Sequence, residues 1–278
     1  NDTPAGARPT LAGPGTFPVI EFFGLGGSAR GFDINLASGT GLQGASVSNV
    51  TVVDVAITMS AGATNAVLFN GIAGTNNLNN VDITGAAGST NSALLLLNNS
   101  GTTSFVDSSV SGFTGGYVLN VNGNSGTISF DSTSDLASSN TRGLTIQTQT
   151  ATGVVNLAGV NLAGGAASEP LIRLQSNPLA STVTSAGGVV AAAPTADSAA
   201  FLSDGGRLRI AGSSTLSATD GAALYLESVE LTQNATFASL TSTSSQARGI
   251  SIDSPVGNND VIVSGTTTVN SPTTEAVP

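Results

Sequence analysis

The chain has 278 residues, a formal net charge of −10 and neither Cys nor His, and all seven of its basic residues are Arg. This composition excludes disulfides, thiolate metal sites, imidazole general bases and Schiff-base lysines. The acidic charge argues against nucleic acid and anionic membranes as partners. Hydrophobic residues make up 40% of the chain and alternate with polar ones, which predicts a folded chain rather than a disordered one. No apolar run approaches the roughly 18 residues that a transmembrane helix needs.

Residues 1–29 are rich in Pro and Phe. Four of the ten Pro residues lie within positions 1–18, and three of the ten Phe residues lie within Phe17–Phe23. We expect residues 1–29 to form an N-terminal cap or connector, in which Phe17–Phe23 packs over the first coil of a repeat fold or docks onto a neighbouring subunit. The chain begins at Asn1 and its only Met is Met59, so we expect a mature or excised piece of a longer protein.

A degenerate repeat of about 25 residues runs from residue 30 to 270, a period typical of stacked solenoids. Two consecutive copies are Ala93–Phe105 and Val118–Phe130. Three slots per repeat alternate apolar with polar residues, which predicts strands with one buried face. The first slot contains Val81–Thr84, Ser109–Ser111, Asp135–Ala137 and Val160–Leu162. The second contains Ala66–Phe69, Ala93–Leu97, Tyr117–Val121, Gly143–Ile146 and Leu171–Leu174. The third contains Asn77–Leu78, Ser104–Phe105, Ser129–Phe130 and Asn156–Leu157.

These slots predict an all-β fold, a right-handed parallel β-helix with three strands per coil of about 25 residues. Leu95, Leu119, Ile146 and Ile172 occupy the second slot, and we expect all four to point inward and stack on their counterparts one coil away. Asn, Thr and Ser at the corners are expected to form hydrogen bonds along the axis, as in stacked cross-β ladders.

The period slips between about residues 180 and 200, where Ser185–Pro194 interrupts it. We interpret the region near residues 185–200 as a loop insertion that leaves one corner of the β-helix. Residues 271–278 are polar and rich in Pro and Thr, which predicts a linker.

The repeat units resemble those of right-handed parallel β-helices in large bacterial surface proteins, including autotransporter-type passenger domains. The resemblance lies in units such as Leu119–Phe130 and Arg142–Ile146 and covers roughly residues 30–270. It implies an adhesive, scaffolding or display module that is exported to the bacterial cell surface.

An Arg-Gly-aliphatic-x-aliphatic element occurs three times, at Arg30–Ile34, Arg142–Ile146 and Arg248–Ile252. The three Arg side chains are candidates for binding acidic glycans along one edge. The alternative, which we favour, is that each Arg covers a corner before a strand while the Gly permits the turn.

Acidic residues provide a second group of candidates. Asp82, Asp107, Asp131 and Asp135 lie near one corner of successive coils, where stacked carboxylates could bind Ca²⁺ or act as an acid/base pair. Solvated Asp at a turn is the interpretation that we favour. A lyase would also need a basic residue, for which the candidates are Arg142 and Arg173, and a hydrolase would need paired acids such as Glu227 and Glu230. Three glycosylation sequons, at Asn49, Asn98 and Asn234, are expected by chance in such a composition.

The sequence therefore predicts a non-enzymatic, extracellular structural, adhesive or assembly module of a bacterial surface protein, with no catalytic, cofactor-binding or metal-binding residue and no cofactor. The expected partners are cell-surface glycans or proteins, or copies of the chain end to end. The alternative is a β-helix polysaccharide lyase or glycoside hydrolase. A groove that gathers carboxylates beside an Arg would favour the enzyme.

Overall fold

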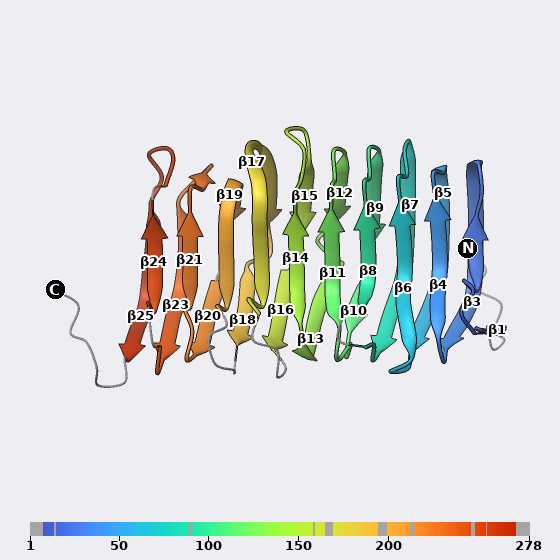
Figure 1. The fold of residues 1–278 in the computed structure, drawn as a ribbon, viewed down its shortest axis with the longest axis horizontal. Helices are drawn as coiled ribbons and strands as arrows, with labels where there is room; N and C mark the ends of the chain where they lie inside the picture. The colour runs from blue at the N-terminus through green and yellow to red at the C-terminus, as the bar shows by residue number, and fades with distance from the viewer. Residues whose placement is uncertain are drawn as a thin grey trace.

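The computed structural model describes residues 8–13, 15–88, 91–157, 159–164, 169–193, 199–211, 214–245, 248–253 and 255–270. These residues form 25 parallel strands that stack as a β-solenoid of about 10 turns (Figure 1). β1 and β25 lie at opposite ends of the rod. The expected all-β parallel β-helix is confirmed, and the region that was expected to be a linker, residues 271–278, lies outside the described residues.

Three stacks of strands form the three sides of each coil. The first, which we call the Tyr sheet because it carries both Tyr residues, comprises β2 (Ile20–Phe22), β4 (Gly39–Ala45), β6 (Ala63–Asn70), β8 (Ser92–Leu97), β11 (Tyr117–Asn122), β14 (Gly143–Gln147), β17 (Ile172–Ser185), β19 (Phe201–Ile210), β21 (Leu224–Glu227) and β24 (Ile250–Asp253).

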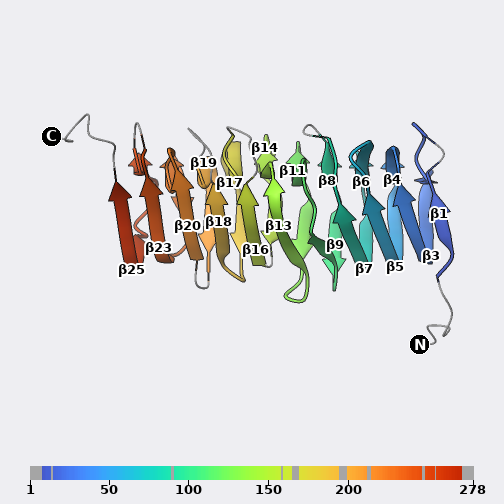
Figure 2. The same ribbon diagram turned by 90° about the horizontal axis from the view of Figure 1, so that it is seen from below.

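We call the second stack the base sheet, and Figure 2 shows its strands side by side from one end of the rod to the other. It comprises β1 (Thr10–Ala12), β3 (Leu25–Leu36), β5 (Ser48–Met59), β7 (Thr75–Gly85), β10 (Ser109–Ser111), β13 (Asp135–Thr141), β16 (Gly159–Gly164), β18 (Val189–Ala193), β20 (Ser214–Thr219), β23 (Ala235–Thr243) and β25 (Val261–Asn270). The third stack comprises β9 (Thr102–Val106), β12 (Thr127–Phe130), β15 (Val154–Leu157) and β22 (Glu230–Leu231), together with parts of the long strands β3, β5, β7, β17 and β19.

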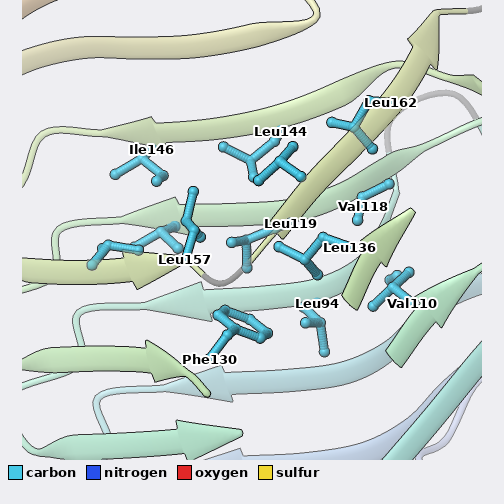
Figure 3. Packing of buried hydrophobic residues seen from close by; sticks show 14 of the residues in the cluster. Leu94, Val110, Val118, Leu119, Phe130, Leu136, Leu144, Ile146, Leu157 and Leu162 are labelled. Carbon is cyan, nitrogen blue, oxygen red and sulfur yellow. The ribbon is translucent and has the colours of Figure 1, made fainter. Parts of the chain in front are cut away.

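The observed register matches the predicted slots. In the second slot, Leu94, Leu119, Leu144 and Ile172 are successive partners in β8, β11, β14 and β17. Their side chains are buried in one continuous column, part of the core in Figure 3. Each coil therefore buries its apolar residues mainly against the coils on either side, which is how solenoids gain stability.

The prediction that Leu95 points inward is wrong, whereas Leu119, Ile146 and Ile172 are buried as expected. Leu95 pairs with Leu68 and Asn120 in a partly exposed outer column, while its neighbours on the strand are buried. Four consecutive leucines carry no alternation, so the sequence does not reveal the phase of the strand, and a shift by one residue moves a side chain to the opposite face.

Polar ladders line the corners of the coils, as expected. The buried Asn99 donates from Nδ2 to Oδ1 of Asn124 at 3.3 Å, and Asn124 donates to Oε1 of Gln149 at 3.4 Å. The backbone N–H of Gln149 then donates to Oδ1 of Asn177 at 3.1 Å. These hydrogen bonds join side chains of successive coils and pair most of the buried polar groups at this corner, although Nε2 of the buried Gln149 has no hydrogen-bond partner.

The recurrent glycines mark a close approach between coils. A Cβ added at Gly101 would lie 2.2 Å from the carbonyl oxygen of Gly74, and one added at Gly126 would lie 2.0 Å from that of Gly101. Only glycine fits this column, which explains why the sequence repeats it in successive coils.

The Phe-rich N-terminal segment joins the solenoid through β2, in which Phe22 pairs with Gly44 of β4. Gly44 leaves space in the inner column, so the buried Phe22 ring reaches the ring of Phe69, two coils away, at a centroid distance of 6.4 Å in an edge arrangement. Phe17 and Phe23 are 72% and 74% exposed. Within Phe17–Phe23, therefore, Phe22 packs on the first coils while these two Phe side chains face away from the core.

The predicted loop insertion near residues 185–200 falls between β17 and β19. β17 extends to Ser185, and β18 keeps the register of the base sheet, with Val160 paired to Val189. Residues 194–198 lie outside the described part of the chain.

Candidate functional site

Two of the three Arg-Gly elements occupy equivalent positions on the Tyr sheet. Arg142 precedes β14 and Arg248 precedes β24, each two residues before a member of the same inner column, Leu144 or Ile250. Four coil steps separate them, which at about 4.8 Å per step is on the order of 19 Å. Arg30 instead lies in β3, outside the Tyr sheet, and pairs with Asp54 at 3.6 Å.

Arg142 is part of a closed cluster with Tyr117 and Glu169, which we call the closed station. The guanidinium of Arg142 forms an ion pair with Glu169 and lies 4.8 Å from the centroid of the Tyr117 ring. The hydroxyl of Tyr117 donates to Oε2 of the same carboxylate at 2.5 Å. With 18% of the Arg142 side chain exposed, the three groups largely satisfy one another.

The electrostatics of the closed station follow from this packing. Burial, reinforced by the hydrogen bond to Glu169, raises the pKa of Tyr117 to about 12. The hydrogen bond from Tyr117 and the ion pair with Arg142 lower the pKa of Glu169 below its ordinary value. Both shifts favour a neutral Tyr117 beside an ionised Glu169 over the whole neutral pH range.

The equivalent position at Arg248 lies beside an open groove of about 490 Å³, which we call the open station. Leu202 and Tyr225 are register partners in the outer column of β19 and β21 and both line the groove. The lining residues are Pro170, Ala199, Leu202, Asp220, Gly221, Ala222, Tyr225, Ser245, Arg248 and Asp253.

Polar contacts at the open station leave the Tyr225 ring uncovered by a cation–π partner. The hydroxyl of Tyr225 donates to Oε2 of Glu227 on its own strand at 2.9 Å, and this contact raises the pKa of Tyr225. Arg248 donates from Nη1 to the hydroxyl of Ser251 at 3.1 Å. Among the described residues, the only cation–π contact is the one between Arg142 and Tyr117.

A row of carboxylates runs beside the open station. Asp204, Glu227 and Asp253 are successive register partners in β19, β21 and β24. Together with Asp220 they outnumber Arg248, so this part of the surface has an excess of negative charge. Within the described ranges no group of three or more acidic side chains is arranged to hold a metal ion.

The aspartates predicted from sequence lie elsewhere, away from both stations. Burial raises the pKa of Asp131, but hydrogen bonds that stabilise its ionised form outweigh burial and lower that pKa. The hydroxyls of Ser134 and Thr133 donate to Oδ1 of Asp131 at 2.7 Å and 2.9 Å, and the backbone N–H of Asp107 donates to it at 3.2 Å. Asp82 and Asp135 are both register partners of Ser109, and the Ser109 hydroxyl donates to Asp82 at 2.6 Å. The turn interpretation therefore fits Asp107 and Asp131, but it is wrong for Asp82 and Asp135, which are exposed residues of strands β7 and β13.

The other candidates are divided between the two stations and the rest of the surface. Arg173 lies in the outer column of the Tyr sheet between the stations, paired with Thr145 and Leu202. Glu227 belongs to the open station, whereas Glu230 forms an ion pair with Arg207 at 2.8 Å. The three sequon asparagines all form hydrogen bonds. Oδ1 of Asn49 accepts from the backbone N–H of Thr75, Oδ1 of Asn234 accepts from that of Asp260, and Nδ2 of Asn98 donates to Oδ1 of Asn70.

The sequence analysis did not single out Tyr117, Glu169, Asp220, Tyr225 or Asp253. One signal was present, because Arg142 and Arg248 stand in the same phase of the same slot and each has a Tyr on the preceding strand of that slot. The two Tyr positions differ, since Tyr117 pairs with Gly143 whereas Tyr225 pairs with Ser251.

No protein-family model, curated protein or solved structure matches this chain. The described residues contain no helix that is long and apolar enough to cross a membrane. The assignment of a function therefore depends on the repeat units, the solenoid and the two stations of the Tyr sheet.

Proposed function

We propose that the chain is a rigid, non-enzymatic module of a bacterial surface protein, which acts outside the cell in adhesion, display or assembly. The observation that carries this proposal is the unbroken stack of about 10 turns with one continuous core. At about 4.8 Å per turn the rod is on the order of 50 Å long. Such a rod holds an outer lattice of side chains at fixed spacing, which suits multipoint contact with a large surface.

The location and the adhesive role need separate tests. Antibodies raised against the whole chain are expected to label intact cells of the source bacterium without permeabilisation. Labelling that requires permeabilisation would contradict the extracellular location. For adhesion, beads coated with the chain should be retained under flow on cell or glycan surfaces, and beads coated with heat-denatured chain should not.

A polysaccharide lyase or glycoside hydrolase is the second candidate, and the open station favours it. Asp220 and Asp253 line one groove with Arg248, and a pair of carboxylates on either side of a sugar is the requirement for glycoside hydrolysis. We expect no release of reducing ends from neutral or uronic-acid polysaccharides, with or without added Ca²⁺. Turnover that is lost in both Asp220→Asn and Asp253→Asn would overturn the non-enzymatic proposal.

End-to-end assembly is a further form of the same structural role. In β25, Ile262 and Val269 are 40% and 49% exposed, and edge strands of parallel sheets are templates for pairing with another strand. Light scattering tests this form, because assembly would raise the particle mass with concentration and a single chain mass at all concentrations would exclude it.

A further inference from the structure

We propose that the open station binds an uncharged oligosaccharide, with one sugar ring stacked on Tyr225 and the sugar hydroxyls at the polar rim. This inference rests on the proposed adhesive function and names the ligand class of that surface. The groove volume of about 490 Å³ lies within the range of about 300–1,000 Å³ that is usual for small-ligand sites.

The lining of the groove has the two-sided character that a sugar requires. Leu202, Tyr225 and Pro170 supply an apolar surface that includes an aromatic ring. The remaining polar side chains combine carboxylate acceptors with guanidinium and hydroxyl donors. A pyranose ring presents apolar C–H groups on its face and hydroxyls around its edge, and each hydroxyl both donates and accepts. The groove therefore complements the face and the edge of a sugar at the same time.

The charge distribution selects an uncharged ligand. Asp220 and Asp253 line the groove, and Glu227 accepts the hydrogen bond from the Tyr225 hydroxyl. This excess of carboxylates repels uronic acids, sulfated glycans and phosphates. A strongly cationic ligand would in turn meet Arg248 in the same rim. A hydroxyl-rich neutral ligand uses the acceptors and the donor together without burying an unpaired charge.

The closed station shows why Tyr225, and not Tyr117, is the stacking residue. The guanidinium of Arg142 covers the face of the Tyr117 ring at 4.8 Å, and Glu169 occupies the Tyr117 hydroxyl. At the open station Tyr225 lines the groove, and its hydroxyl donates a hydrogen bond to Glu227 on the same strand. The two Arg-Gly elements occupy the same register, but Tyr117 pairs with Gly143 and is covered by Arg142, whereas Tyr225 pairs with Ser251 and lines the groove.

The test is a titration of the whole chain with four defined hexasaccharides. Calorimetry measures the affinity, and saturation-transfer NMR identifies the protons of the sugar that contact the chain. Maltohexaose and cellohexaose are the neutral probes, hexagalacturonate is the anionic probe and the glucosamine hexamer is the cationic probe. We expect at least one neutral probe to bind more tightly than both charged probes, with transfer to its ring C–H protons. Tighter binding of either charged probe, or no binding of either neutral one, would overturn the proposal.

Variants locate the site. Tyr225→Ala should lower the affinity for the neutral probe about tenfold or more, because the stacking surface is lost. Tyr225→Phe keeps the ring and should retain most of the affinity. Leu95→Ala is the matched control, because Leu95 lies in the same outer column on a coil outside the groove. Equal affinity of Tyr225→Ala and the parent chain, with both folded by circular dichroism, would refute the location.

The bead experiment separates this inference from the proposed function. If coated beads adhere but neither neutral probe binds, or Tyr225→Ala binds the probe as tightly as the parent chain, the glycan site is refuted and the adhesive role stands. If beads coated with the parent chain adhere to no surface although the neutral probe binds the chain, the adhesive role is refuted, and the assignment of the groove as a glycan-binding site is retained.

Discussion

The closed and open stations contain the same Arg-Gly element in the same register, yet the side chains that contact the Arg differ. At the closed station Glu169 lies just before β17 and joins Arg142 to the Tyr117 hydroxyl. At the open station Tyr225 lies farther along its strand and bonds to Glu227, and Arg248 bonds to Ser251 on the strand that follows it. The two stations therefore differ both in the position of the Tyr on its strand and in the presence of a carboxylate that joins the Arg to the Tyr hydroxyl.

The comparison also shows how a solenoid can vary its surface without disturbing its core. The inner column from Leu144 to Ile250 continues through both stations. Differences are confined to the corners and the outer column, where neighbouring coils impose few constraints. A binding surface can therefore change from coil to coil while the rod remains the same.

The glycines that follow the two Arg residues provide the strongest test of the comparison. A Cβ on Gly143 would lie 1.8 Å from the carbonyl oxygen of Leu171, and the residue has a φ of +104°. That oxygen accepts the N–H of Leu144 at 2.8 Å. We expect Gly143→Ala to lower the free energy of unfolding by about 3 kcal/mol or more, since backbone strain and a displaced hydrogen bond add up. Chemical denaturation measures the loss.

Gly249→Ala is the matched substitution at the open station. Its Cβ would meet side-chain atoms, Cγ1 of Val269 at 2.5 Å and Cβ of Ser242 at 3.0 Å, and Val269 is 49% exposed and free to shift. We expect a loss of only about 1 kcal/mol. Equal losses for the two glycines would show that the stations are not distinguished by how tightly the adjacent coils pack.

The repeat pattern predicted most of this fold because each strand repeats the apolar positions of the strand one coil earlier. All three slots between residues 66 and 174 coincide with observed strands. Leu95 was placed on the wrong face because a run of four leucines has no phase. The stations were not predictable in the same way, because their contacts join corner residues such as Glu169 and Asp220, whose positions depend on corners of unequal length.

Removal of the bridging carboxylate should open the closed station. Glu169→Ala leaves Arg142 and the Tyr117 hydroxyl without their shared acceptor, and we expect about 1–2 kcal/mol of lost stability at neutral pH. Glu169→Gln keeps an acceptor and should lose less. Since the pKa of Glu169 is lowered in the folded chain, its contribution is present above its usual value of 4.5 and fades as the pH falls through the folded pKa.

The control for this prediction is Glu227→Ala at the open station. Glu227 accepts one hydrogen bond from the partly exposed Tyr225 and forms no ion pair among the described residues. Its removal should change stability by less than about 0.5 kcal/mol. A larger loss for Glu227→Ala than for Glu169→Ala would reverse the assignment of the closed and open stations.

The smallest expected effect is a difference between the two Tyr residues in alkali. The chain has two Tyr and no Trp, so tyrosinate absorbance can be assigned with single variants. In Tyr225→Phe the remaining Tyr117 should ionise near its pKa of about 12 instead of its usual value of 10.0.

This raised pKa has a consequence for stability whose sign is fixed by linkage. Because folded Tyr117 holds its proton more tightly than unfolded Tyr117, the stabilisation is fully present below pH 10 and is lost as the pH rises toward about 12. Tyr117→Phe has no phenol to ionise at this position and should decline less steeply between these values than Tyr225→Phe. Parallel stability curves for the two variants would mean that the Tyr117 hydroxyl is as open to solvent as that of Tyr225, and that the closed station is not closed in solution.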